Sequence, residues 1–412
     1  MPKLSKAKPH AAQRAQEICD HFRHPLLTPE AMLDAYRRHR QLATLLPAKV
    51  IRNVEDTVAA LAPEGLTISA YLQACLRHPA LFCQAPTTLA RNVRAVCDSF
   101  AASGLIPADY VKACLRHPQL FSLRAERVVN NVEHVASAFQ SSHVAREQYL
   151  EACLAHPQLF GYSPSRIIGG VADVTRRFEK VGLSPEAYVQ ACMARPSVLC
   201  FKPSTLSANV EKLLRHFAAD GLTEAAYIRA CIRRPELLTL RPETLTTNVE
   251  SLLARFPPDC LPRRRYLAAC VRRPQLFLQR PETLAAAVTS VVSRFASVGL
   301  TLEGYLGACL RLPPLFSLRP TTVIRHVELA AALYLADLLG LPTGPPYAPW
   351  APLFDFLNRH PEVYSFSDDN LRLRERYAQI VRPRPSTALL RLSRAQIEQA
   401  VAEWGKASPP RS

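Results

Sequence analysis

The sequence has no run of 18 or more apolar residues, so it offers no membrane-spanning helix. Its first residues, Met1 to His10, contain no apolar stretch suited to a secretory signal. The high usage of alanine, arginine and proline is typical of bacterial proteins. We therefore expect a chain without a membrane partner, working in a bacterial-type cytoplasm. In that reducing compartment the 12 cysteines are expected to be thiols rather than disulfides.

The sequence also lacks the short motifs that mark common active sites. It has no Gly-rich phosphate loop, no His-Glu-x-x-His pair and no nucleophile elbow. Every Cys, His and Tyr that stands out belongs to a repeated series, whereas an enzyme needs one unique constellation. We therefore expect no enzyme activity, no catalytic residues and no cofactor.

A strict internal repeat is what the sequence does contain. Seven cysteines, each preceded by alanine, follow one another at steps of 39 residues: Cys75, Cys114, Cys153, Cys192, Cys231, Cys270 and Cys309. The same step relates tyrosines from Tyr71 to Tyr305 and prolines from Pro79 to Pro313. A fixed period of this length indicates stacked structural repeats.

The period divides the chain into four parts. Residues 1–29 form a basic N-terminal segment. Residues 30–340 form the helical repeats, a degenerate first unit followed by seven regular units of 39 residues. Residues 341–392 hold a divergent last repeat after a Pro/Gly loop, and residues 393–412 a C-terminal helix and tail.

Each unit predicts two helices joined by a proline turn. Thr67 can cap a helix that runs to His78, and Pro79 ends it. The Pro-x-Leu-Phe turn buries Phe82, Pro86 opens the second helix, and a glycine such as Gly104 ends it. No strand-like alternation is present. We expect a monomeric all-α protein, a right- or left-handed α-solenoid of about nine two-helix repeats with capping units.

The turn sequence Leu115-Arg116-His117-Pro118-Gln119-Leu120-Phe121, with a second proline opening the next helix, resembles the mitochondrial transcription termination factor family. The resemblance covers about residues 30 to 370. It implies a curved α-solenoid that holds duplex DNA or structured RNA in a positively charged groove, usually in an organelle.

The periodic cysteines raise the question of a metal site. Three of them precede a histidine by three residues, as in Cys75 and His78, which places both on one helical face. Where the histidine becomes arginine or leucine, the cysteine persists. That persistence favours a small buried side chain at a helix crossing, so we expect no metal.

Positive charge is in excess, and its position matters more than its amount. The formal net charge is +17, which favours an anionic partner. Residues 1–29 carry five Lys or Arg against two Asp or Glu, and residues 370–412 carry nine against three. Solvated basic tails on a neutral scaffold therefore remain an alternative, unless the repeats order their own cations.

The cations of the repeats fall into two periodic rows. The first row lies at the C-terminal end of the first helix: Arg77, Arg116, Arg233, Arg272 and Arg311, joined by His78, His117, His156, Arg195, Arg234 and Arg273. The helix dipole stabilises cations there without any ligand, so this row alone is weak support for a binding site.

The second row lies one residue before the second helix: Arg124, Lys202, Arg241, Arg280 and Arg319. A cation is unfavourable at a helix N-terminus and is a poor cap. Free N–H groups beside a guanidinium can bind phosphate, so we expect this row to contact a nucleic-acid backbone. Long side chains lying over the preceding aromatic turn are the structural alternative.

Positions that vary between constant repeats are candidates for base reading, as in modular readers of single-stranded RNA. On the first helix these are Gln73, Lys112, Glu151, Gln190, Arg229, Ala268 and Gly307. Ordinary drift on a solvent-exposed face explains the same variation. The sequence therefore predicts a nucleic-acid partner, DNA or RNA, with a protein-binding helical scaffold as the alternative.

Overall fold

The computed structural model describes residues 9–331, 350–367, 369, 370, 373 and 395–399. Within these ranges all regular structure is helical, which confirms the predicted all-α class. None of the helices described is long and apolar enough to cross a membrane. The loop predicted at 341–347 and the tail from residue 400 lie outside the described residues.

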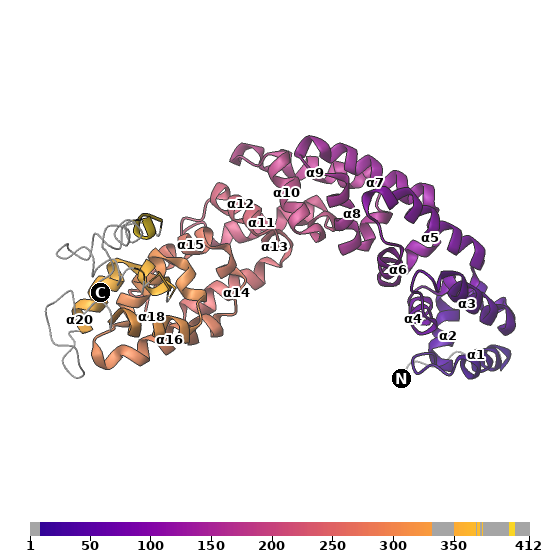
Figure 1. The fold of residues 1–412 in the computed structure, drawn as a ribbon, viewed down its shortest axis with the longest axis horizontal. Helices are drawn as coiled ribbons and strands as arrows, with labels where there is room; N and C mark the ends of the chain where they lie inside the picture. The colour runs from indigo at the N-terminus through magenta and orange to yellow at the C-terminus, as the bar shows by residue number, and fades with distance from the viewer. Residues whose placement is uncertain (1–8, 332–349, 368, 371–372, 374–394, 400–412) are drawn as a thin grey trace, which may run out of the picture. The chain divides into compact units, whose positions relative to one another are not determined.

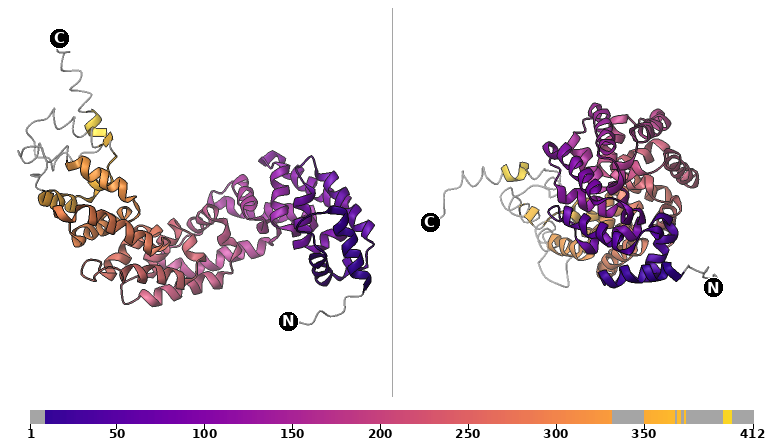
Figure 2. Two further views of the ribbon diagram at one scale, coloured as in Figure 1. Left: turned by 90° about the horizontal axis from the view of Figure 1, so that it is seen from below. Right: turned by 90° about the vertical axis from the view of Figure 1, so that its right-hand side faces the viewer.

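The chain divides into two compact units, residues 1–207 and 208–412. Both units are built from the same pattern of a ten-residue helix, a short turn and a longer second helix (Figures 1 and 2). In the repeat that begins with α4 (Ile68–Arg77), the turn η2 (Pro79–Cys83) leads to α5 (Pro86–Phe100). The pattern then recurs along each unit in chain order.

The N-terminal unit begins with α1 (Pro9–Phe22). Besides α4, the first helices of its repeats are α2 (Pro29–Arg38), α6 (Pro107–Arg116), α8 (Arg146–Ala155) and α10 (Pro185–Ala194). Its other turns are η1 (Arg40–Thr44), η4 (Pro118–Ser122), η6 (Pro157–Gly161) and η8 (Pro196–Cys200). Its other second helices are α3 (Pro47–Leu61), α7 (Ala125–Phe139), α9 (Pro164–Phe178) and the beginning of α11 (Pro203–Phe217).

The C-terminal unit continues the pattern after α11. Its first helices are α12 (Glu224–Arg233), α15 (Arg263–Arg272), α17 (Leu302–Arg311) and α20 (Trp350–Arg359). Its turns are α13 (Glu236–Thr239), η9 (Pro274–Phe277), η11 (Pro313–Ser317) and η13 (Pro361–Ser365). Its second helices are α14 (Pro242–Leu253), α16 (Pro281–Phe295) and α18 (Pro320–Ala330).

The expected capping residues begin and end these helices. The Thr67 hydroxyl accepts a hydrogen bond from the Ala70 amide at 3.3 Å and so caps α4. After α5, the short helix η3 (Ala101–Ser103) leads to Gly104, whose φ of 80° is left-handed. The Pro-x-Leu-Phe segment is a full 3₁₀ helix rather than an irregular turn, and Leu81 and Phe82 are completely buried in it.

Helices of one kind pack on the next helix of the same kind. In the N-terminal unit, α3, α5, α7 and α9 pack in series, and so do α2, α4, α6, α8 and α10. In the C-terminal unit, α14, α16 and α18 form one series, and α12, α15, α17 and α20 the other. A single repeat has too little core of its own, so each buries its apolar face against its neighbours.

Aromatic rings join successive repeats at most of these interfaces. The Tyr71 ring meets the Phe121 ring of the next turn edge to face, with 5.7 Å between ring centroids. The same contact recurs 50 residues apart in Tyr110–Phe160, Tyr227–Phe277 and Tyr266–Phe316. These edge-to-face pairs stabilise the interface beyond their buried area.

A second inter-repeat contact uses an asparagine inside the second helix, a role that the sequence did not reveal. The Asn53 amide donates to the Phe82 carbonyl of the next turn at 2.9 Å. The same bond joins Asn131 to Phe160, Asn209 to Leu238 and Asn248 to Phe277. At the equivalent position His326 contacts the Tyr364 carbonyl at 2.9 Å. The recurrence of asparagine at steps of 39 was the available signal.

Candidate functional site

Both predicted rows of cations lie at the same edge of the repeat. The 3₁₀ turn joins the C-terminal end of each first helix to the N-terminal end of the second. We call this border, with the last residues of the first helix and the residue before the second helix, the turn edge. It recurs along each unit, so whatever chemistry it carries is repeated in series.

Arginines at the last position of the first helix bind the following repeat. Arg233 donates to the carbonyls of Val271 and Arg272 at 2.6 and 3.1 Å. The same pair of contacts is made by Arg38, Arg116 and Arg272, and Arg77 contacts the Leu115 carbonyl. We call these five the inter-repeat arginines.

The carbonyls that they bind are the ones left without partners at a helix C-terminus. Arg77, Arg116, Arg233 and Arg272, predicted to bind nucleic acid, thus already have internal partners. Arg311 holds the same position, but its exposed guanidinium has no such bond among the described residues.

The next residue of the turn edge is the C-cap, and it differs between the two units. In the N-terminal unit it is His39, His78, His117, His156 and then Arg195. In the C-terminal unit it is Arg234, Arg273 and Leu312, and His360 follows α20 at the same position. The histidines are partly buried, whereas all three arginines are exposed.

Burial lowers the pKa of three of these histidines, His78, His117 and His156. For His78 the lowering by burial is reinforced by His39 and His117, and for His156 by Arg195 and Arg116. Desolvation disfavours the charged imidazole, and neighbouring cations disfavour it further. These histidines are therefore neutral at pH 7, and their charge appears only in acid.

The five predicted N-cap cations are all exposed. Arg124, Arg241, Arg280 and Arg319 each occupy an N-cap with extended backbone and make no capping bond, and Lys202 directly precedes α11. Among the described residues these five side chains have no hydrogen bond or ion pair. They do not lie in contact with a carbonyl as the inter-repeat arginines do, so their charge faces solvent.

The helix N-termini behind these cations offer fewer free amides than the sequence suggested. Pro242 opens α14 and has no N–H, and the Thr244 amide bonds back to the Arg241 carbonyl at 3.0 Å. An acidic residue stands in the first turn of three of the helices, namely Glu126, Glu243 and Glu282. These anions already complement the helix dipole, so the cationic side chains rather than the helix ends define the site.

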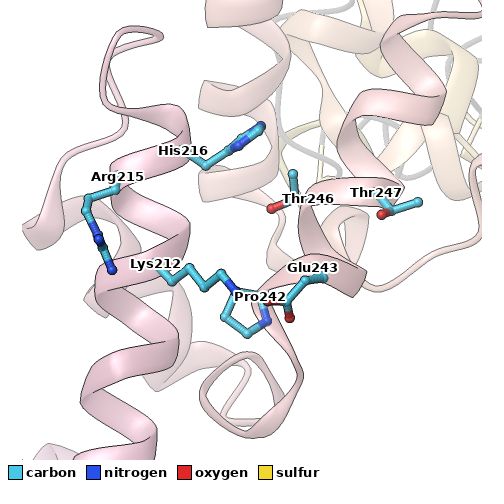
Figure 3. A pocket seen from close by; sticks show the side chains of 7 residues that line it. All are labelled: Lys212, Arg215, His216, Pro242, Glu243, Thr246 and Thr247. Atoms are coloured by element: carbon cyan, nitrogen blue, oxygen red, sulfur yellow. Dashed lines mark hydrogen bonds and ion pairs between the residues drawn. The ribbon is translucent and has the colours of Figure 1, made fainter.

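Beside Arg241, a hollow of about 540 Å³ opens between α11 and α14. Lys212, Arg215 and His216 line it from α11, and the beginning of α14 supplies the opposite wall (Figure 3). Lys212 pairs with Glu243, while the exposed Arg215 has no partner among the described residues. The hollow thus places a second unpaired cation next to the turn edge.

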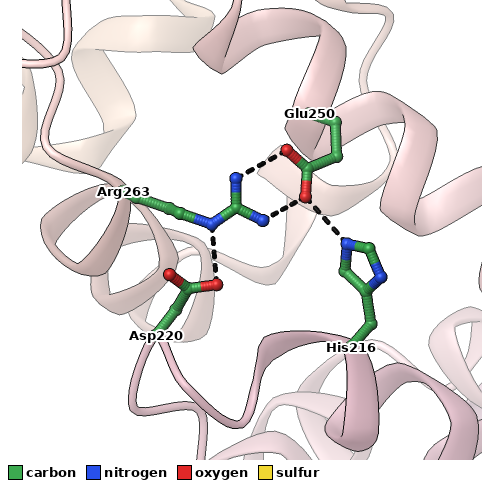
Figure 4. Close-up of polar contacts among 4 residues, drawn as sticks. All are labelled: His216, Asp220, Glu250 and Arg263. Atoms are coloured by element: carbon green, nitrogen blue, oxygen red, sulfur yellow. Dashed lines mark hydrogen bonds and ion pairs between the residues drawn. The ribbon is translucent and has the colours of Figure 1, made fainter.

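An ion-pair network that also includes His216 lies at the C-terminal ends of α11 and α14. Arg263 contacts Asp220 at 2.7 Å and Glu250 through two nitrogens, and His216 lies 2.8 Å from Glu250 (Figure 4). The hydrogen bond from Arg263 lowers the pKa of Glu250. Both carboxylates are held as acceptors, so the network joins two repeats and provides no free acid or base.

The seven periodic cysteines are buried, as predicted. Burial raises the pKa of Cys192 and of Cys270 to about 12, so these thiols are unreactive near neutral pH. In the described ranges no group of three or more His, Cys, Asp and Glu side chains could hold a metal ion.

Six of the seven variable positions on the first helix are exposed, and Gly307 is partly buried. Gln190 donates to the Ser142 carbonyl at 2.8 Å, so it serves a structural contact. The turns also vary between repeats at one position. There Gln119 is exposed, and the equivalent residues are partly buried, namely Ala80, Gln158, Ser197, Glu236, Gln275 and Pro314. The exposure of the first-helix positions is thus compatible with base recognition by the first helices. No contact among the described residues indicates a preference for one base.

No protein-family model matches this chain, and comparison with curated proteins finds no match. The resemblance to the mitochondrial transcription termination factors therefore stays a prediction based on the turn motif. The proposed function therefore depends on the geometry of the turn edge.

Proposed function

We propose that this protein is an α-solenoid of about nine two-helix units that binds nucleic acid through its phosphates along the turn edge. Its role is binding rather than catalysis, in a bacterial-type cytoplasm. The N-cap cations Arg124, Lys202, Arg241, Arg280 and Arg319 are its principal phosphate contacts. The C-cap arginines Arg195, Arg234 and Arg273 add charge to the same edge.

One observation carries the proposal: the basic residues of the turn edge separate into bonded and unbonded sets. The inter-repeat arginines use their N–H donors on the next helix, which accounts for their recurrence by structure alone. The N-cap cations recur with the same period but are exposed and bond nothing among the described residues. A cation at a helix N-terminus does not assist folding, so its recurrence favours a partner that carries regularly spaced negative charge.

The C-terminal unit is the denser part of this surface. All three of its N-cap positions preceding α14, α16 and α18 are arginine. In the N-terminal unit the same position is Leu46, Ala85, Arg124, Ser163 and Lys202. We therefore assign the larger share of phosphate binding to Arg241, Arg280 and Arg319.

The test compares three fluorescent anions by anisotropy: a DNA duplex, a single-stranded RNA and a poly-glutamate peptide. Nucleic-acid binding predicts that at least one of the two nucleic acids binds more tightly than the peptide at 150 mM salt and loses affinity steeply as salt rises. Equal binding of all three, or of the peptide alone, would contradict the proposal and favour a protein-binding scaffold. Selection from random DNA and RNA pools then identifies the preferred form.

A further inference from the structure

Among the repeats that the structure describes, one junction has none of the three side-chain contacts that recur at the others. It lies in the N-terminal unit, between α8, η6 and α9 on one side and α10 and η8 on the other. Three kinds of contact join successive repeats elsewhere: the inter-repeat arginine, the asparagine-to-carbonyl bond and the tyrosine ring pair. Each has a fixed register in the 39-residue step, so its presence can be checked position by position.

At this junction the residue in each register has changed. Ala155 stands where Arg116 occurs one repeat earlier, Gly170 where Asn131 occurs, and Leu199 where Phe160 occurs. The junction immediately before it has all three contacts: Arg116 to Ala155, Asn131 to Phe160 and Tyr110 to Phe160. The change therefore falls between two neighbouring interfaces of one unit.

The second helix at the junction is also intrinsically weak. Gly169 and Gly170 lie side by side in the interior of α9, where glycine is less favourable than other residues by loss of chain entropy. The Thr175 hydroxyl donates back to the Val171 carbonyl at 2.9 Å, a bond that tends to bend a helix. A hollow of about 360 Å³ lies between the end of α7 and the helices α9 and α10, and is lined partly by Phe139, Val171 and Val189.

What joins the two repeats instead is more exposed. Arg166, on the surface of α9, donates to the Cys200 carbonyl at 3.3 Å and lies over the Tyr162 ring. Gln190 on α10 adds a hydrogen bond to the Ser142 carbonyl before α8 at 2.8 Å. Hydrogen bonds from two exposed side chains stabilise an interface less than a buried asparagine and a buried ring pair. Packing of α9 against α10 remains.

We propose that this junction is the opening point of the N-terminal unit, where α9 and α10 separate locally while neighbouring repeats stay packed. The loss of three contacts and the paired glycines act on the same interface, and in a stack of repeats stability is a sum over such interfaces. Opening here changes the local curvature of the turn edge, which adapts it to a bound partner. The inference does not depend on which partner binds.

Hydrogen exchange of the full chain, followed by mass spectrometry of peptides, tests this directly. The helices α7 and α9 have the same length and the same place in the repeat, so they form an internal comparison. Each missing hydrogen bond or interior glycine corresponds to roughly a fivefold change in an opening equilibrium. We expect the α9 amides to exchange at least about tenfold faster than the α7 amides, after correction for intrinsic rates. Equal or slower exchange in α9 would overturn the proposal.

A pair of neighbouring substitutions separates the junction from simple helix weakness. Gly170→Asn places an amide in the register that reaches the Leu199 carbonyl, and a β-carbon there meets only Pro203 at an ordinary 3.6 Å. Gly169→Asn removes a helical glycine equally but lies one residue out of that register, with nothing within 4 Å. We expect Gly170→Asn to slow exchange in both α9 and α10, and Gly169→Asn to slow it in α9 alone. The same effect from both variants would contradict the role of the junction.

Restoring all three contacts gives the strongest form of the experiment. The combined variant Ala155→Arg, Gly170→Asn and Leu199→Phe should bring α9 exchange to within about threefold of α7. If the combined variant folds with α9 still exchanging at the rate of the unaltered protein, the missing contacts are not what sets the opening.

Discussion

Two hollows at the same place in the repeat differ in charge. The hollow between α3 and α5 in the N-terminal unit, about 660 Å³, shares six lining positions of the repeat with the one between α11 and α14 in the C-terminal unit, about 540 Å³. Asp56 of the first is replaced by Lys212 in the second, and the N-cap Ala85 by Arg241. At these two positions the same scaffold thus carries a carboxylate and an alanine in one unit and two cations in the other.

The comparison shows that the fold requires little of these positions. Both units keep the buried tyrosine, the proline turn and the inter-repeat arginine, while the charge at the hollow changes from Asp56 to Lys212. Surface charge in a repeat protein is therefore free to be selected for binding, repeat by repeat. The C-terminal unit is the place where that charge has accumulated.

The largest expected effect comes from removing the charge that distinguishes the C-terminal unit. Replacing Arg241, Arg280 and Arg319 with serine should reduce the slope of log affinity against log salt by about 2.5 to 3 for a duplex, at roughly 0.9 per phosphate contact. Titrations of a labelled duplex at several salt concentrations measure it. The melting temperature should stay the same or rise slightly, because serine is the better cap.

The matched control removes three exposed cations away from the turn edge, Lys180, Arg264 and Arg265. Replacing these with serine changes the net charge equally but should leave the slope within about 1 of the original. Equal losses in the two variants would mean that net charge, rather than the turn edge, attracts the nucleic acid.

The next effect concerns a contact that both units share. Asn131→Ala should lower the free energy of unfolding by about 1 to 3 kcal/mol, because the buried Phe160 carbonyl loses its donor. Urea unfolding followed by circular dichroism measures it. Asn92 holds the same position one repeat earlier, is partly exposed and donates no hydrogen bond within the described residues. Asn92→Ala should therefore cost less than half as much, and equal costs would reject the assigned role.

A smaller effect is expected from the inter-repeat arginines. Arg233→Ala should destabilise the C-terminal unit by about 1 kcal/mol, since two carbonyls at the end of α15 lose an exposed donor. Arg311→Ala is the control, because Arg311 has the same position and exposure without such bonds among the described residues. The midpoint of urea unfolding should fall in Arg233→Ala and stay unchanged in Arg311→Ala.

The smallest effect is a pH dependence at three histidines of the N-terminal unit. Burial holds the pKa of His78, His117 and His156 below the usual 6.5, so lowering the pH from about 7.5 to 5.5 adds positive charge to the turn edge there. The slope of log affinity against log salt should become steeper, by less than the value of one phosphate contact for each histidine. Replacing the three with glutamine should abolish the increase, and an unchanged pH response would place these rings away from the nucleic acid.

The same shifts have the opposite sign for stability. Because the folded-state pKa is lowered, the unfolded chain binds protons first, so the stability contribution is complete above about pH 6.5 and is lost as the pH falls through the folded-state pKa. Acid should therefore strengthen binding and weaken folding of this unit. The glutamine variant should show neither effect.

Much of the fold could be predicted because the 39-residue step exposes it. The proline turn, the Thr67 cap, the left-handed Gly104 and the buried cysteines all follow from local chemistry repeated in register. Asn53 and its equivalents were used only to align the repeats, since nothing local shows that a side chain reaches the backbone of the next repeat. Contacts between repeats depend on packing geometry, which periodicity alone does not supply.

The candidate site was predicted less completely for the same reason. The sequence shows arginine at both positions of the turn edge, but it does not distinguish Arg233, which binds two carbonyls, from Arg241, which faces solvent. Because the helix dipole stabilises cations only at the C-terminal end, the second row was the stronger candidate for phosphate binding. The sequence-based interpretation overestimated the free amides behind the second row, because proline or an acidic residue occupies the first turn of each of these helices.

The most direct test of the central claim is the salt dependence of nucleic-acid binding when all five N-cap cations are changed together. Replacing Arg124, Lys202, Arg241, Arg280 and Arg319 with serine should leave the helical circular dichroism signal and melting temperature intact. The slope of log affinity against log salt for a duplex should shrink by about 4 to 5. A folded fivefold variant that binds with the original slope would show that the turn edge is not where this protein holds nucleic acid.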